Sequence, residues 1–196
     1  MKTNILLAIA AISATASTNA ADLTAVPSGK YTLDPTHAYI HFSYNHLGLS
    51  EPQLSFDDFS VELTLDNQNV AASSVAVTID PTSVETGSEI FHDHLTGADW
   101  FDTASFPQIS FNSASITEEG DKLMVDGELT IKGQSKPITL DVTVNNAMEH
   151  PMAKKPVIGI TGTAKLKRSD FGLGNFAPYV GDDVSIRFTA ELLAAE

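Results

Sequence analysis

Histidine and carboxylate side chains are the groups in this sequence that could bind a metal ion or transfer protons. The segment FHDHLTGADWFDTASFPQISF, residues 91–111, places His92 and His94 on either side of Asp93. Metal ligands must converge to within about 2 Å of one point. On a helix His92 and His94 would point about 200° apart, because each residue turns the helix by about 100°. This pair therefore does not form a metal site.

A second pair, His37 and His41, has the H-x-x-x-H spacing that can share an ion on a helix. The surrounding sequence HAYIHFSYNH alternates like a strand instead, and four strand residues span about 13 Å. The two rings therefore cannot reach one ion. We predict no metal site, and a site assembled from distant strands stays open as the alternative.

The motifs of hydrolytic and nucleophilic catalysis are missing from the sequence. It contains no G-x-S-x-G, no H-E-x-x-H and no cysteine. Asp57 and Asp58 are adjacent on an expected strand and so face opposite sides, which prevents them from acting on one bond. The glycines of FGLGNF, residues 171–176, lack the strand-to-helix context of a dinucleotide loop. We predict that the protein is not an enzyme and needs no cofactor.

Strands are the main elements that would position these side chains, because apolar and polar residues alternate with period two. FSVELTLD, for example, places Phe59, Val61 and Leu63 on one side. Residues 88–95 break the rhythm and predict a short helix, with Thr86 or Ser88 as its cap and Gly97 as its stop. The expected strands, about eight, are 37–46, 59–66, 74–80, 107–116, 122–133, 138–145, 157–168 and 184–191.

Eight antiparallel strands with one apolar face each predict a two-sheet sandwich or a closed barrel. Alternation alone does not choose between them. A barrel of eight strands has an interior just wide enough to be filled by side chains or to hold one small ligand. Gly162 and Ala164 on the inward side indicate unfilled space, a bulge or close packing.

Aromatic side chains gather in two places. Phe91, Trp100, Phe101, Phe106 and Phe111 lie within the segment quoted above, and Phe171, Phe176 and Tyr179 form a second group. They could plug the end of a barrel as ordinary core, or form a lid over the mouth of a cavity. Both can hold at once, since residues that plug an apolar tunnel also line it.

Charge and the N-terminal sequence limit location and partners. The formal net charge is −14, and Lys30 is the only basic residue between 21 and 121, which argues against a nucleic-acid partner. Lys2, the apolar run 5–12 and the small residues up to Ala20 predict a signal peptide at residues 1–20, with cleavage after Ala16 as the alternative. No later segment reaches the roughly 20 apolar residues of a membrane helix. We expect one exported domain, residues 21–196, with no integral membrane segment after cleavage.

Four stretches together resemble one family. They are YTLDPTHAYIHFSYNHLGLS, HLTGADWFDTASFPQISF, GELTIKGQSKPITLDV, and KLKRSDFGLG followed by VGDDVSIRFTAEL. In this order and spacing they resemble the YceI-like family over about residues 28–193. The segment EPQLSFDDFS departs from the pattern, because a glycine would be expected near the start of its strand.

The resemblance implies an all-β, eight-stranded antiparallel lipocalin-like barrel with a short helical plug, exported to the bacterial periplasm. It implies non-catalytic binding, transport or sequestration of a long isoprenoid lipid such as a polyprenyl phosphate or an isoprenoid quinone, with a homodimer as a possible assembly. The alternatives are an enzyme acting on such an amphiphile, and an envelope stress protein with a fatty-acid-type ligand.

We assign the expected ligand-binding residues by the side of the strand or loop on which they lie, and not by a motif. Arg168, His92 and His94 are the candidates for the head group, because a guanidinium binds oxyanions in bidentate fashion. An ion pair of Arg168 with Asp170 or Asp183, and local hydrogen bonds of the histidines, are the alternatives. The expected lining residues are Ile40, Phe42, Tyr44, Phe59, Val61, Leu63, Phe91, Leu95, Trp100, Phe101, Phe111, Leu129, Ile160, Phe171, Phe176 and Phe188.

Overall fold

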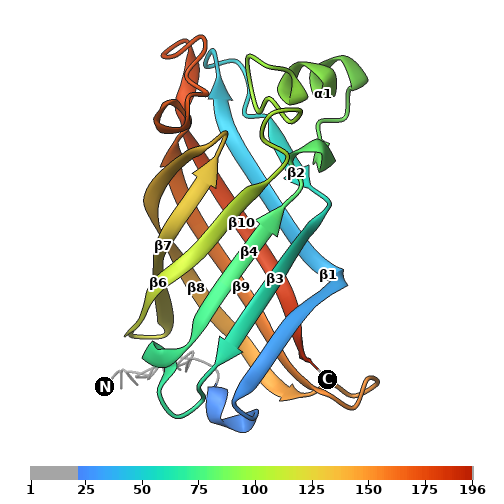
Figure 1. Cartoon of the computed structure of the whole chain (residues 1–196), viewed down its shortest axis with the longest axis vertical. Coiled ribbons are helices and arrows are strands. Elements are labelled where there is room, and N and C mark those ends of the chain that lie inside the picture. The colour runs from blue at the N-terminus through green and yellow to red at the C-terminus, as the bar shows by residue number, and fades with distance from the viewer. Residues whose placement is uncertain (1–21, 196) are drawn as a thin grey trace, which may run out of the picture.

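The structure, a computed structural model, describes residues 22–195 (Figure 1). The signal peptide expected at residues 1–20 lies outside the described residues.

Eight long strands form a closed antiparallel barrel (Figure 1). Each of these eight strands pairs with the one that follows it among the eight in the sequence, and the last strand pairs with the first. The fold is therefore the predicted barrel and not the sandwich, and closure pairs each long strand on both sides over at least part of its length. The barrel strands are β1 (Gly29–His46), β3 (Phe59–Leu65), β4 (Ser74–Ile79), β6 (Ile109–Glu119), β7 (Lys122–Ile131), β8 (Gln134–Glu149), β9 (Pro156–Lys167) and β10 (Val180–Ala194).

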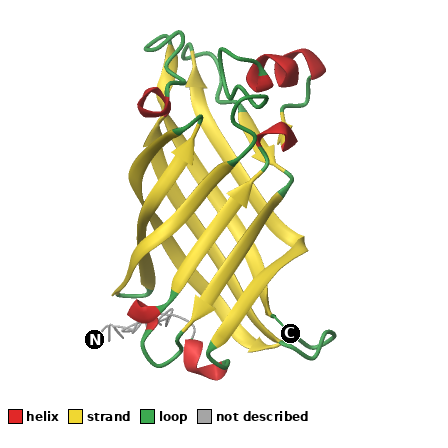
Figure 2. Cartoon of the chain, in the orientation of Figure 1, coloured by secondary structure: helices red, strands yellow, loops and turns green. Residues whose placement is uncertain are grey.

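Short elements lie beside the barrel or at its ends (Figure 2). The helix α1 (Glu89–Thr96) begins after Ser88, whose side chain accepts a hydrogen bond from the Phe91 N–H, and it ends at Gly97 as predicted. Two short strands, β2 (Gln53–Phe56) and β5 (Val84–Glu85), pair with each other, and β2 pairs with β1. The 3-10 turns are η1 (Leu23–Ala25), η2 (Val70–Ala72), η3 (Pro81–Ser83) and η4 (Arg168–Phe171).

The period-two pattern of the sequence matches the inside and outside of the barrel. On β7, Val125, Leu129 and Ile131 are buried, and they alternate with Asp126, Glu128 and Thr130, which are more exposed. The turn to β8 is formed by Lys132 and Gly133, which both have positive φ. Two successive residues with positive φ match the twist of a two-residue hairpin.

Inward glycines make room for aromatic rings on neighbouring strands. A Cβ at Gly162 on β9 would overlap the ring of Phe188 on β10, and a Cβ at Gly127 on β7 would overlap the ring of Phe111 on β6. Gly162 and Phe188 are direct partners in the strand register. Gly162 is therefore a packing position, one of the alternatives that the sequence left open.

Strand β1 changes its partner part-way along. Its first residues, 29–32, pair with β3, whereas residues 40–43 pair with β2. The pairing with β10 is irregular between Leu33 and Ala38, a stretch that contains Pro35, which has no N–H to donate. The result is a seam between β1 and β3, residues 33–39 of β1, where β1 has no ladder partner on that side.

The two ends of the barrel differ. At the end that carries η1, Tyr31 and Ile158 are each 1% exposed and belong to a tightly packed cluster. The other end carries α1 and the loop that follows η4 (Figure 1). There Leu47, Phe176 and Tyr179 are 50%, 66% and 77% exposed. We call the first the closed end and the second the open end.

Candidate functional site

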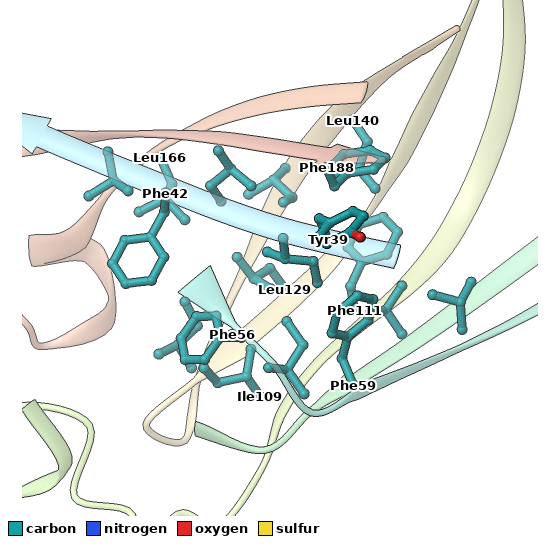
Figure 3. Close-up of a pocket in the computed structure, with 18 of the residues that line it drawn as sticks. Tyr39, Phe42, Phe56, Phe59, Ile109, Phe111, Leu129, Leu140, Leu166 and Phe188 are labelled. Atoms are coloured by element: carbon teal, nitrogen blue, oxygen red, sulfur yellow. The ribbon is translucent and has the colours of Figure 1, made fainter. Parts of the chain in front are cut away.

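The inward faces of the barrel strands enclose an apolar cavity (Figure 3). Its volume is about 730 Å³, within the range of roughly 300–1,000 Å³ that is usual for small-molecule sites. All eight barrel strands contribute lining side chains, and nearly all of these are aliphatic or aromatic. The cavity reaches from Leu65 and Leu192 near the closed end to Leu47 and Tyr179 at the open end. The cavity therefore runs through the barrel between its two ends and has an almost entirely hydrocarbon lining.

The structure places every predicted lining residue except Phe171 along this cavity. Phe171 is 1% exposed and packs in the buried core without lining the cavity. It lies in the turn η4, where the alternation of a strand does not apply. Whether the lining residues hold a ligand remains a proposal.

The prediction omitted many lining side chains that the same alternation could have supplied. Those on the strands continue the inward sides of β3, β4, β6, β7, β8, β9 and β10, and they include Leu65, Val75, Val77, Ile79, Ile109, Ile116, Leu123, Val125, Ile131, Ile138, Leu140, Val142, Val144, Ile158, Leu166, Val184, Ile186 and Leu192.

Tyr39 lines the cavity, although alternation along β1 would place its side chain on the outer face of the barrel, because that of Ile40 lies on the inner face. It is 52% exposed and borders the seam between β1 and β3. Figure 3 shows its ring beside the other cavity residues. Because no ladder covers the seam, a residue there contacts both solvent and the interior. No pattern in the sequence indicates this position.

Arg168 is a buried charge at the open end, and its hydrogen bonds are internal. Its guanidinium donates to the carbonyl oxygens of Leu173, Asn175, Val180 and Gly181. It thereby fastens the loop between η4 and β10. The alternative ion pair with Asp170 or Asp183 does not form; Lys167 instead lies 3.5 Å from the carboxylate of Asp183.

Burial lowers the pKa of the Arg168 guanidinium, because the surroundings disfavour the charged form. An arginine nevertheless keeps its proton in proteins. The cavity therefore has a positive charge at its open end. Burial also raises the pKa of the Tyr44 phenol, which lines the same end.

Trp100 lies at the centre of an aromatic group at the open end. The Arg168 Cζ is 5.6 Å from its ring centroid, and the His94 ring meets it edge to face at 5.7 Å. The ring of Phe176 is 6.4 Å away. The indole Nε1 is buried, and it has no hydrogen-bond partner among residues 22–195. The aromatic group is thus both a plug and part of the lining.

The two histidines of α1 have different surroundings. His94 lines the cavity. His92 does not; its Nε2 lies 3.0 Å from the carbonyl oxygen of Thr82, and this hydrogen bond raises the pKa of the His92 ring. His92 therefore has the local partner that was the alternative to a head-group role.

One group of potential metal ligands lies away from the cavity lining. Asp34, His37 and Glu191 each offer a ligand atom, and these atoms lie within 4.8 Å of one another. His37 Nδ1 is 3.0 Å from the Asp34 carboxylate. The Asp34 carboxylate also accepts hydrogen bonds from the backbone and the hydroxyl of Thr36, so the group has a structural role at the irregular part of β1.

A family model described as the YceI-like domain matches residues 31–192. The chain belongs to the YceI-like family. The resemblance seen in the sequence is therefore confirmed, and it extends through every strand of the barrel.

Relatives in the YceI-like family cover most of the chain. Protein YceI of Escherichia coli O157:H7 is 38% identical over 137 residues, which are 70% of this chain and 71% of that protein. The crystal structure of BcnA from Burkholderia cenocepacia is 29% identical, with a TM-score of 0.73 over 81% of this chain and 98% of BcnA. A polyisoprenoid binding domain from Saccharophagus degradans has a TM-score of 0.66 over 84% of this chain and 98% of that domain, and is 18% identical, so that likeness concerns the fold alone.

Membership in the YceI-like family, together with the cavity, supports a binding role. Within residues 22–195, no helix combines the length and the apolar composition that crossing a membrane requires.

Proposed function

We propose that the protein binds a long isoprenoid lipid inside the barrel and carries or sequesters it without catalysis. The ligand would be a polyprenyl phosphate or an isoprenoid quinone. The observation that carries the proposal is the cavity of about 730 Å³, which all eight barrel strands line with hydrocarbon side chains. The predicted lining residues other than Phe171 are its proposed contacts.

Burial of hydrocarbon supplies enough free energy for tight binding. Each five-carbon isoprene unit transferred from water gains roughly 3–4 kcal/mol, at about 0.8 kcal/mol per carbon, before ordering costs are subtracted. A few units therefore suffice, and no catalytic group is needed. Affinity should depend on the length of the tail more than on the head group.

The polar lining side chains give the ligand a direction. Tyr44, His94, Trp100 and Arg168 line the cavity at the open end, whereas the closed end is packed with apolar side chains apart from Ser73. An amphiphile would place its tail toward the closed end, and its head group near Arg168 and His94. The charge of Arg168 would attract a head-group oxygen.

The periplasm is the proposed location. Support comes from the signal peptide predicted at residues 1–20, which would be removed on export. An exported carrier is consistent with a chain that contains no cysteine, because its barrel does not rely on disulfides.

A series of prenyl alcohols with two, three and four isoprene units tests the proposal by calorimetric titration. We expect affinity to rise steeply with each unit. Oleate, a straight-chain comparator, should bind more weakly than the four-unit alcohol. Equal affinity for all three alcohols would contradict tail burial, and tighter binding of oleate would favour the fatty-acid alternative.

The same titrations distinguish a carrier from an enzyme. After prolonged incubation the lipid is extracted and analysed by mass spectrometry. A carrier returns the lipid chemically unchanged, whereas a new product that forms in proportion to protein and time would contradict the non-catalytic role.

A further inference from the structure

Residues 34–37 of β1 have no ladder partner on either side. The pairing with β10 stops at Leu33 and resumes at Ala38. On the other side, the pairing with β3 ends at Thr32 and the pairing with β2 begins at Ile40. Figure 1 shows that β1 bends sharply part-way along. A segment with few backbone hydrogen bonds to its neighbours opens at low cost in free energy.

The cavity reaches the seam from the inside. Across the seam from β1, residues 59–61 of β3 pair with β4 alone. Phe59 on this edge and Tyr39 on β1 both line the cavity (Figure 3). Tyr39 is at the same time 52% exposed. The boundary between the cavity and solvent is therefore formed at the seam by side chains and not by a hydrogen-bonded ladder.

The Tyr39 side chain should move at lower cost than the aromatic rings of the open end. Its ring stacks on the exposed ring of His41, with centroids 6.4 Å apart. At the open end, the Phe176 ring packs 6.4 Å from that of Trp100, and the loop around it donates its carbonyl oxygens as acceptors to the buried Arg168. Hydrogen bonds to a charged donor are among the strongest in proteins. Displacing this loop therefore costs more than turning a half-exposed side chain.

We propose that the seam between β1 and β3 is a side entrance through which the apolar tail of the ligand enters and leaves the cavity, and that the Tyr39 side chain covers it. The entrance admits a flexible hydrocarbon chain, because Tyr39, Phe59 and Val61 line the cavity there. This proposal rests on the proposed function, and it adds the route by which the ligand exchanges.

Stopped-flow fluorescence measures the rates with the three-unit prenyl alcohol as the probe. The signal comes from Trp100, which is the only tryptophan of the chain and lines the cavity. Tyr39→Ala should raise the association rate constant about tenfold, which corresponds to a barrier lower by about 1.4 kcal/mol. Loss of a contact alone would act mainly on the dissociation rate constant.

His41→Ala is the matched control for Tyr39→Ala. His41 is exposed and stacks on Tyr39, but it is not among the lining residues of the cavity. Its association rate constant should stay within about twofold of the wild-type value, because association rates change little among variants of one binding surface.

Phe176→Ala tests the open end as the rival route. Phe176 is 66% exposed and also lines the cavity, so its position at the open end resembles that of Tyr39 at the seam. The side entrance predicts a larger increase in the association rate constant for Tyr39→Ala than for Phe176→Ala. The reverse order would place the route at the open end and overturn the proposal.

A covalent block tests the entrance in the opposite direction. The chain has no cysteine, so Tyr39→Cys can be modified at that one position with a bulky maleimide. We expect the modified protein to bind the three-unit alcohol about tenfold more slowly than unmodified Tyr39→Cys. The same modification of Thr139→Cys, at an exposed position on β8, should leave the rate unchanged. Thermal unfolding checks that all variants are folded.

Two further results would overturn the side entrance: equal association rates for Tyr39→Ala and His41→Ala, or no slowing after modification of Tyr39→Cys. In either case calorimetric titration of the wild type would still show lipid binding. If the wild type binds no prenyl alcohol in that titration, the proposed function itself fails.

Discussion

The guanidinium carbon of Arg168 lies 5.6 Å from the ring centroid of Trp100, and the same guanidinium donates to four carbonyl oxygens, two in the loop before β10 and two at the start of β10. One side chain thus joins a surface loop to the aromatic group at the open end of the cavity. Arg168 is 5% exposed. Unfolding of the ligand-free protein measures its contribution to folding separately from any contribution to binding.

Replacing Arg168 by lysine should destabilise the protein by about 3 kcal/mol, because an ammonium cannot reach all four carbonyls and would leave some of them unpaired. Urea unfolding measures the change. Arg187→Lys is the control, since Arg187 on β10 is exposed and should change stability by less than about 0.5 kcal/mol. Equal stability of the two variants would show that the carbonyl contacts contribute little.

Replacing Gly162 by alanine should destabilise the barrel by about 1–3 kcal/mol, because the new Cβ would force the Phe188 ring to move. Gly159→Ala on the same strand is the control, since the nearest atoms to a Cβ there lie at 4.0 Å. Urea unfolding of both variants measures the difference. The packing argument fails if Gly162→Ala is as stable as Gly159→Ala.

Replacing Leu140 by tryptophan should shorten the tail that the cavity accepts, because Leu140 is a lining residue (Figure 3). Loss of room for one isoprene unit would remove roughly 3–4 kcal/mol, so we expect at least a tenfold weaker affinity for a four-unit prenyl alcohol and little change for a two-unit one. Thr139→Trp, one residue earlier and exposed, should leave both affinities unchanged. Unchanged affinity for the four-unit alcohol in Leu140→Trp would place the bound chain elsewhere.

Asp34 and His37 should titrate as a pair. The hydrogen bond from His37, with those from Thr36, lowers the pKa of Asp34 from 3.8 to about 2. The hydrogen bond to Asp34 raises the pKa of His37 above its usual 6.5. In Asp34→Asn the pKa of His37 should fall toward 6.5, as measured from its ring protons by NMR. An unchanged His37 pKa would show that the contact is absent in solution.

Folding stability should depend on pH in opposite senses for the two groups, because folding lowers the pKa of Asp34 and raises that of His37. Asp34 has a lowered pKa in the folded state, so its contribution is complete above pH 3.8 and is lost as the pH falls through about 2. His37 has a raised pKa, so its contribution is complete below pH 6.5 and is lost as the pH rises through its folded value. The stability difference between wild type and Asp34→Asn should shrink at both extremes.

Much of the barrel could be predicted because one face of each strand is buried. The inward positions of β3, β7, β8 and β10 follow directly from alternation, and the helix α1 from its cap Ser88 and its stop Gly97. Alternation is a property of each strand alone. It could not decide whether the sheet closes, since closure depends on the pairing of β10 with β1.

Other features of the site depend on contacts between distant segments. The place of Tyr39 in the lining follows from the seam left when β1 changes partner between β3 and β2. The carbonyl partners of Arg168 follow from the path of the chain through the loop after η4 into the start of β10. The buried position of Phe171 follows from a 3-10 turn. None of these has a periodic signal in the sequence.

Native mass spectrometry of the protein purified from the cells that naturally produce it tests the central claim most directly. We predict a complex of one protein with one lipid, and extraction should release a molecule built from repeated five-carbon units. Protein mass alone in several independent preparations, or a released lipid with only straight acyl chains, would contradict the account.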